Sequence, residues 1–327
     1  MSVETLETIM NVTIYVFVFL FGITIGSFLN VCILRLPKGE SLVKRNSHCM
    51  TCGTEIKRYD LIPVFSWLIL RGKCRACGAK ISPRYMLIES LTGVVFLAIA
   101  ARYPFMDWEV YPVMLCLFAA GLIVLCFQDI DNREMCVSVL VYTFIIAAAT
   151  RIMDLMGIMP TPVKGITDGL LGMIGVSLVL FIFGFVLTPL FYRGFVSEER
   201  AELRNIRRQM KNVDEKSREY KKLNDKRQSL EKAVSEEEPV YGFGMGDIVL
   251  MAAGGLMLGF KASLTAGLTA VITGAVYGIV RKIASDSDDE NANVFAFGPF
   301  LIIGIMLAVF VGSAPIDLYL GMFTPGA

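Results

Sequence analysis

Residues 12–34 read VTIYVFVFLFGITIGSFLNVCIL, an apolar run without a single Lys, Arg, Asp or Glu. A helix of this length exceeds the roughly 20 residues needed to cross the hydrocarbon core of a bilayer. Glu4 and Glu7 precede the run without any Lys or Arg, so it lacks the basic start of a signal peptide. The run is therefore predicted to be a retained first transmembrane helix.

The composition of the whole chain agrees with a lipid environment. The 327 residues are 55% hydrophobic and only 19% charged, and the mean hydropathy is +0.60. These values lie outside the usual range of soluble globular proteins. The formal net charge of +1 provides no basic field, so a nucleic-acid partner is not expected.

Seven further apolar segments bring the prediction to about eight transmembrane helices in an all-α polytopic membrane protein. They are 85–101, 110–128, 135–152, 165–192, 247–260, 262–281 and 294–313. The segment 247–260 is short and rich in Gly, and Gly259-Phe260-Lys261 is expected to form a tight outer turn to the next span.

The Lys and Arg residues of the loops predict the orientation, because basic loops prefer the cytoplasm. Residues 36–84 hold ten of them against three acids, so this loop is predicted to be cytoplasmic. Every other strongly basic loop then falls on the same side. Both chain termini are predicted to lie outside.

A second polar insert covers residues 195–240. Its apolar residues keep a short heptad rhythm, which predicts a solvated helix or helical hairpin held by opposite charges, as in Glu215 with Glu219 and Lys222. A partly disordered linker is the alternative. Such a segment could bind a cytoplasmic partner.

Four cysteines form two pairs, Cys49-x-x-Cys52 and Cys74-x-x-Cys77, separated by 21 residues in the predicted cytoplasmic loop. Two such pairs in a reducing compartment predict a tetrathiolate zinc site rather than free thiols or disulfides. Four thiolates fill the coordination of the ion, so the zinc is expected to be structural. His48 is an alternative ligand, although a solvated loop residue fits it better. The cysteines at 32, 116, 126 and 136 are expected to be small buried fillers.

Acidic residues near membrane spans are expected to have a functional role or a bonding partner, because their burial in lipid is costly. The candidates are Glu89, Asp129, Asp131, Asp168 and Asp247. Asp129 ends the third span and Asp247 begins the sixth, so both are predicted at the cytoplasmic face at similar depth.

Two facing carboxyls that share one proton can hydrolyse a peptide without a metal. Gly244 and Gly246, just before Asp247, would let a substrate backbone approach closely. Taken alone, Asp129 could equally be a helix cap or the partner of a Lys or Arg. For Asp131, a helix-capping role is favoured over a catalytic one.

At this point the chain resembles the bacterial type IV prepilin peptidases, aspartyl proteases with a GxGD motif. The resemblance covers nearly the whole chain. Its motifs are Gly26-Ser27-Phe28-Leu29-Asn30, the cysteine module with Arg71-Gly72-Lys73-Cys74, Asp129-Ile130-Asp131, Gly244-Met245-Gly246-Asp247 and Phe297-Gly298-Pro299-Phe300.

The resemblance implies a bacterial inner-membrane endopeptidase with Asp129 and Asp247 as its catalytic pair. Its substrates would be prepilins or pseudopilins with a basic leader and an apolar helix in the lipid, cut after a Gly at the cytoplasmic face. It also implies N-methylation of the new N-terminus with S-adenosylmethionine, for which no visible motif marks a binding site. The alternatives are a nonenzymatic zinc-containing membrane scaffold and a transporter with proton-relay acids.

Three features of the sequence depart from the pattern of the family. Met135-Cys136 stands where Ile-Pro is usual, which predicts a less sharply turned entry to the fourth span. Val249 replaces a common Lys, and the 195–240 insert is long.

These features divide the chain into five expected parts. They are a first transmembrane helix (1–35), a cytoplasmic four-cysteine zinc module (36–84), transmembrane helices 2–5 with the first catalytic Asp (85–194), the charged insert (195–240) and transmembrane helices 6–8 with the GxGD motif (241–327).

Overall fold

The structure is a computed structural model that divides into two compact units, Met1–Val176 with Val249–Ala327, and Ser177–Ile248. The described residues are 3–43, 47–108, 110–163, 165–188, 190, 202–203, 205–210, 218–235, 243–284 and 296–323.

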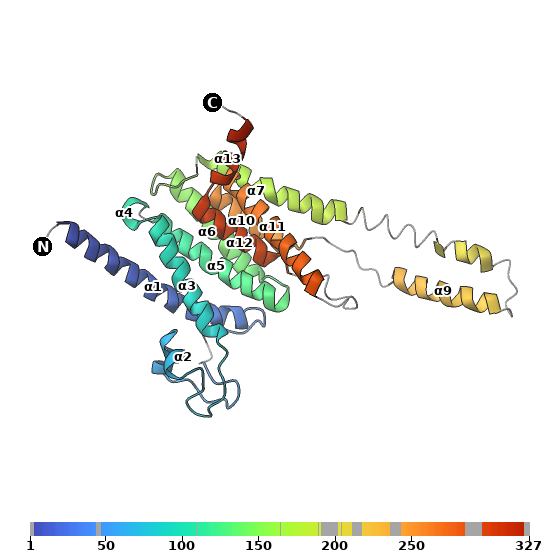
Figure 1. Cartoon of the computed structure of the whole chain (residues 1–327), viewed down its shortest axis with the longest axis horizontal. Coiled ribbons are helices and arrows are strands. Elements are labelled where there is room, and N and C mark those ends of the chain that lie inside the picture. Colours follow the sequence, from blue (N-terminus) through green and yellow to red (C-terminus); the bar gives the residue numbers. More distant parts are fainter. Residues whose placement is uncertain are drawn as a thin grey trace. The chain divides into compact units, whose positions relative to one another are not determined.

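Helices account for nearly all the regular structure of the described residues (Figure 1). In chain order they are α1 (Val3–Arg35), η1 (Arg58–Leu61), α2 (Phe65–Ile69), α3 (Arg84–Arg102), α4 (Phe105–Trp108), α5 (Tyr111–Asn132), α6 (Val137–Leu155), α7 (Gly165–Phe181), η2 (Ile182–Leu187), α9 (Arg218–Ser235), α10 (Met245–Leu258), α11 (Phe260–Ala284), α12 (Gly298–Val311) and α13 (Ala314–Phe323). The predicted all-α polytopic membrane architecture is confirmed.

Each of the eight predicted spans has a counterpart among the helices of the described part of the chain. Six helices in the described part of the chain are long and apolar enough to cross a membrane, and a bent pair brings the number to seven. The predicted span 247–260 corresponds to α10, whose 14 residues reach only about 21 Å. The last span is broken where α12 and α13 meet at 77°, next to Gly312 with a φ of +61°.

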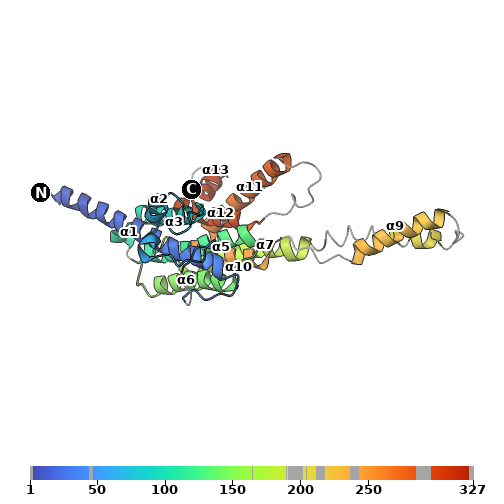
Figure 2. The same cartoon turned by 90° about the horizontal axis from the view of Figure 1, so that it is seen from below.

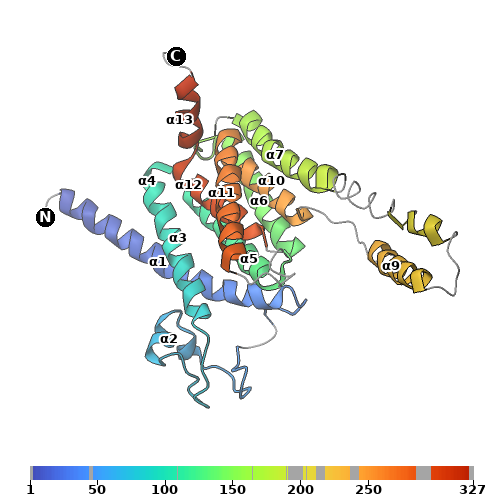
Figure 3. The same ribbon diagram turned by 45° about the vertical axis from the view of Figure 1, so that its right-hand side comes forward.

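Helix α5 lies at the centre of the first unit, because α1, α3, α4, α6 and α12 all pack against it (Figure 3). In its most apolar stretch 72% of the residues are buried inside the protein, against 39% or less for each of the other five spans. Lipid-facing side chains therefore belong mainly to the outer helices, whereas α5 forms the core.

Helices α1 and α3 approach closely because glycines replace side chains between them. A Cβ on Gly22 would lie 2.8 Å from the Cα of Gly93, and one on Gly26 would lie 2.7 Å from the Cα of Glu89. This is the small-residue packing by which membrane helices associate without a hydrophobic driving force. Asn30 adds a hydrogen bond to the Tyr85 carbonyl at 3.1 Å.

The C-terminal helices of the first unit also pack closely through glycines. A Cβ on Gly255 of α10 would meet the backbone of Gly172 in α7, and one on Gly254 would lie 2.9 Å from Ile305 of α12. Helices α11 and α12 lie side by side (Figure 2). The expected tight turn before α11 is confirmed, since Gly259 has a φ of +81°.

The second unit contains part of the charged insert. Leu203, Ile206 and Met210 are buried, as the heptad rhythm predicts. Arg207 pairs with Glu231 of α9 at 2.6 Å, and Lys226 of α9 pairs with Glu202 at 2.8 Å. These contacts make a helical hairpin held by opposite charges, and Glu215, named in the sequence analysis, lies outside the described residues.

We predict that Gly26→Ala lowers the free energy of unfolding by about 1–3 kcal/mol, because the new methyl group meets the backbone of α3. Thermal unfolding in detergent measures this change. Gly321→Ala in α13 is the matched control, since a Cβ there meets nothing within 4 Å. Equal melting temperatures for the two variants would contradict close packing of α1 on α3.

Candidate functional site

Asp129 is a buried acid at the end of the central helix. It lies in the last turn of α5, and the residue is only 6% exposed. Its Oδ2 atom has no hydrogen-bond partner among the described residues. An oxygen left unpaired in this way is costly for a structural residue and available for an incoming water or substrate group.

The N-terminus of α12 closes over the Asp129 carboxylate. A Cβ on Gly298 would lie 2.5 Å from Oδ2, so only a glycine allows this approach. The carboxylate thus lies at the N-terminus of α12, where the helix dipole favours an anion. The Phe297-Gly298-Pro299-Phe300 motif is predicted in the last span, and no pattern in the sequence predicts its contact with Asp129.

Gln128 fixes the end of α5 from the other side. Its side chain is fully buried, donates to the Cys32 carbonyl at 3.5 Å, and accepts the Cys136 N–H at 3.3 Å. Cys136 precedes α6 with a φ of −66°, the value that proline imposes. The expectation of a less sharply turned entry is therefore wrong for the backbone, and Cys136 adds an N–H donor that proline lacks.

Asp131 forms an ion pair rather than a helix cap. Its two oxygens accept from Arg84 at 2.7 and 2.6 Å, which joins the end of α5 to the start of α3. The guanidinium also lies 5.2 Å from the centre of the Phe127 ring. Asp129 and Asp131 therefore have different surroundings although they are two residues apart.

Asp247 is the second buried acid and lies in the first turn of α10. The residue is 8% exposed, and its Oδ2 accepts the Gly244 N–H at 3.1 Å while its own N–H donates to the Gly244 carbonyl. This reciprocal pairing resembles a capping box with Gly244 at the N-cap. One carboxylate oxygen thus holds the turn that contains the GxGD motif.

A short π-helix, η2, packs beside that turn within the second unit. A Cβ on Gly184 of η2 would lie 3.2 Å from the Phe243 nitrogen, immediately before Gly244. Single π-helical turns occur frequently at functional sites. The sequence carried no pattern that would have distinguished this turn from the α-helix before it.

Asp129 belongs to the first unit and Asp247 to the second. Their pairing, and the roles of Gly244 and Gly246 in substrate approach, therefore stay predictions.

The two remaining candidate acids have structural partners. Glu89 of α3 is buried and accepts the Val64 N–H at 2.6 Å, and Asp168 of α7 accepts the Phe260 N–H at the start of α11 at 3.0 Å. Both bonds tie one segment of the first unit to another.

The four cysteines of the predicted zinc site come together. Their Sγ atoms all lie within 4.8 Å of one another, and those of Cys49 and Cys77 are 3.9 Å apart. A tetrahedral zinc with Zn–S bonds of about 2.3 Å separates its sulfurs by about 3.8 Å. The donor set therefore fits a structural zinc, and His48 is not among the clustered ligands of the described chain.

The two cysteine pairs lie in equivalent loops. Each first cysteine donates its N–H to the residue five positions later, Thr54 or Ala79, and accepts from a glycine four positions later. Gly53 and Gly78 both have a φ of +70°, so the tight turn requires glycine at each. The antiparallel bridges His48 with Glu55 and Lys73 with Lys80 close the two loops.

Hydrogen bonds act differently on the cysteines of this module. Against the lowering effect of the Ala79 backbone, the pKa of the Cys77 thiol is raised to about 11 beside the other thiols. The pKa of the Cys49 thiol is lowered to about 6 by the backbone of Cys52 and then of Thr51, which favours the thiolate that a metal requires. Hydrogen bonds from Arg75 hold the pKa of Asp60 below its usual value, with a closest distance of 2.6 Å.

We predict that the purified chain contains one zinc ion, because the four thiols fit a single tetrahedral site. Elemental analysis by mass spectrometry measures the zinc content. Cys49→Ser is expected to lose most of the metal, whereas Cys32→Ala, which changes a buried cysteine outside the cluster, keeps it. Zinc retained in full by Cys49→Ser would contradict this ligand set.

Comparison with known proteins gives consistent matches. Residues 20–103 match the family model described as the Bacterial Peptidase A24 N-terminal domain. A prepilin leader peptidase/N-methyltransferase of Myxococcus xanthus is 43% identical over 117 residues, 36% of this chain and 34% of that protein. A type 4 prepilin-like proteins leader peptide-processing enzyme of Escherichia coli is 39% identical over 130 residues, 34% of this chain and 47% of that protein.

These two alignments thus cover between a third and a half of the relatives' lengths. A prepilin leader peptidase/N-methyltransferase of Bacillus subtilis is 25% identical over 304 residues, which are 93% of this chain and 97% of that protein. No solved structure matches the chain.

Proposed function

Because the comparisons confirm the resemblance to bacterial type IV prepilin peptidases, we propose that this chain is a membrane-embedded aspartyl endopeptidase. It removes the basic leader from prepilin-like proteins after a Gly, at the cytoplasmic face of the bacterial inner membrane. The observation that carries the proposal is the buried Asp129 carboxylate, whose Oδ2 is unpaired among the described residues at the end of a membrane span.

Asp129 and Asp247 are proposed as the catalytic pair. One carboxylate takes a proton from water, and the water oxygen attacks the scissile carbonyl carbon. The other carboxyl gives its proton to the substrate as the peptide bond breaks. Two close carboxyls hold a single proton between them in this way, and the pair titrates as one unit.

Similar depths for the two acids are expected from the order of the spans. Spans alternate in direction, so the end of the third span and the start of the sixth are expected at the same membrane face.

The basic loops support the orientation. With residues 36–84 and 195–240 as cytoplasmic modules, both chain termini lie outside, and the ends of α5 and α10 that carry the acids face the cytoplasm. A substrate leader rich in Lys and Arg would stay on that side, while its apolar helix remains in the lipid.

N-methylation of the new N-terminus is part of the proposal, since the relatives' names include this activity. S-adenosylmethionine would supply the methyl group to the freed amine. No residue of this chain is assigned to bind it.

We predict that Asp129→Asn and Asp247→Asn each abolish leader removal, since an amide can neither take nor give the required proton. Mass spectrometry of a co-expressed prepilin-like protein reports the cut and any methyl group together. Asp131→Asn is the matched control: it loses the Arg84 pair, worth up to about 1 kcal/mol, and keeps cleavage. Normal processing by both catalytic variants would refute the mechanism.

The zinc is proposed to be structural, so its removal is expected to leave hydrolysis intact. A variant with all four cysteines changed to Ser should still cut short substrates, with weaker capture of full-length ones as a measurable increase in KM. Complete loss of cleavage in a correctly inserted variant would place the metal in the chemistry.

A further inference from the structure

A hydrogen bond holds the zinc module against the membrane-spanning helix α3. The Val64 N–H, at the start of α2, bonds Glu89 at 2.6 Å, and Glu89 lies in the second turn of α3. At 1.5 Å per residue, that position is about 7–8 Å inside the end of a spanning helix. Val64 also has a φ of +64°, which is unusual for a β-branched residue.

Helix α2 directly follows Val64, and one of its faces is apolar and exposed. Phe65, Leu68 and Ile69 are 48%, 53% and 75% exposed, and their spacing of three and four residues places them on one face. Leu61 and Ile62, which shortly precede Val64, are exposed as well. We call these five residues the α2 apolar face, and each of them is at least 41% exposed.

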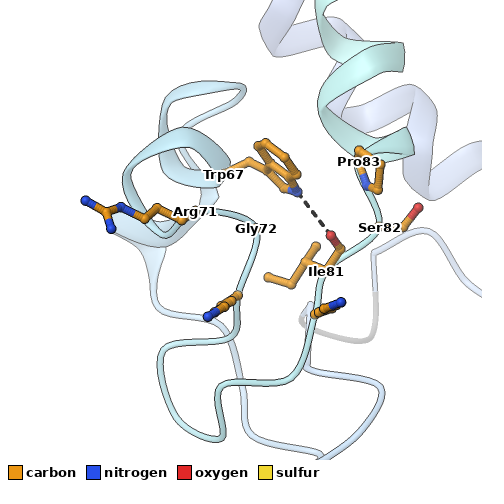
Figure 4. A pocket seen from close by; sticks show the side chains of 8 residues that line it. Trp67, Arg71, Gly72, Ile81, Ser82 and Pro83 are labelled. Atoms are coloured by element: carbon orange, nitrogen blue, oxygen red, sulfur yellow. Dashed lines mark hydrogen bonds between the residues drawn. The ribbon is translucent and has the colours of Figure 1, made fainter.

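A basic pocket lies behind α2 (Figure 4). Its volume is about 430 Å³, and it is lined by Trp67, Arg71, Gly72, Lys73, Lys80, Ile81, Ser82 and Pro83. The Trp67 indole N–H donates to the Ile81 carbonyl at 3.2 Å, and Gly72 packs on the indole ring. Because Pro83 directly precedes α3, the pocket lies where that span leaves the membrane.

The cations of the pocket have no carboxylate partner in the described part of the chain. Lys73 and Lys80 lie opposite each other across an antiparallel bridge, an arrangement that repulsion between like charges disfavours. The equivalent bridge of the first cysteine loop joins His48 with Glu55 instead. An anion between the two lysines would remove the repulsion, whereas the Arg71 side chain points away from Trp67 and Ile81 (Figure 4).

We propose that the zinc module is a membrane-surface anchor. The α2 apolar face enters the boundary of the acyl chains, and the basic pocket binds the headgroup of an anionic phospholipid. Exposed apolar residues beside Trp and clustered cations are the usual features of a segment at an anionic membrane surface. This inference needs only that α3 spans a membrane and does not depend on the peptidase proposal.

The two tryptophans of the chain provide a test. Trp108→Phe leaves Trp67 as the sole indole reporter beside the pocket. The full zinc-loaded chain is placed in lipid nanodiscs with phospholipids brominated near the headgroup, carried either on the anionic lipid or on the neutral one. Brominated anionic lipid is expected to quench Trp67 at least about twofold more than brominated neutral lipid.

Two sets of substitutions distinguish specific binding from general attraction. The variant R71Q/K73Q/K80Q is expected to lose the preference for anionic lipid. K38Q/K57Q/R58Q removes the same charge from exposed positions of the module outside the pocket and is expected to keep it. If the triple pocket variant loses zinc, Lys80→Gln alone serves, with a smaller preference as the expected result.

The apolar face has its own variant. F65S/L68S/I69S should reduce quenching by both brominated lipids, because α2 then leaves the acyl boundary. Equal quenching by the two lipids in the unaltered chain would overturn the lipid pocket. Protection of Trp67 by an added prepilin-like peptide, with no lipid preference, would assign the same surface to a protein substrate and overturn the proposal.

Discussion

A carboxylate buried in an apolar helix bundle is the constraint on which the rest of the structure depends. Asp129 is almost fully enclosed, and a charge in such surroundings is costly unless dipoles support it. The N-terminus of α12 lies against it at Gly298, which can approach only because it has no side chain. Helix α12 is one of five helices of the described chain that pack against α5 and enclose it.

The helices around this centre are held by shape rather than by the hydrophobic effect, because lipid is as apolar as their side chains. Glycines at the contacts between α1 and α3, and between α10 and its neighbours, let backbones meet directly. Polar side chains such as Gln128 and Asn30 then add hydrogen bonds to backbone groups of neighbouring segments. A rigid frame of this kind can keep an acid in place at the end of a span.

Local patterns were predictable from the sequence, and contacts between distant segments were not. The spacing of the cysteines led to the metal cluster because each pair forms its own loop, and Gly53 and Gly78 mark the turns. The bend at Gly312 was not predicted, since hydropathy alone does not show where a helix ends. Nothing in the sequence placed Gly298 against Asp129, because that contact joins segments far apart in the chain.

The proposed mechanism depends on the distance between the carboxylates of Asp129 and Asp247, which an experimental structure of the full chain in a lipid nanodisc measures directly. We expect the two carboxylates at the same membrane face and within about 5–6 Å of each other, so that a single water molecule bridges them. Carboxylates at opposite faces of the membrane, or separated by an intervening helix, would contradict the mechanism.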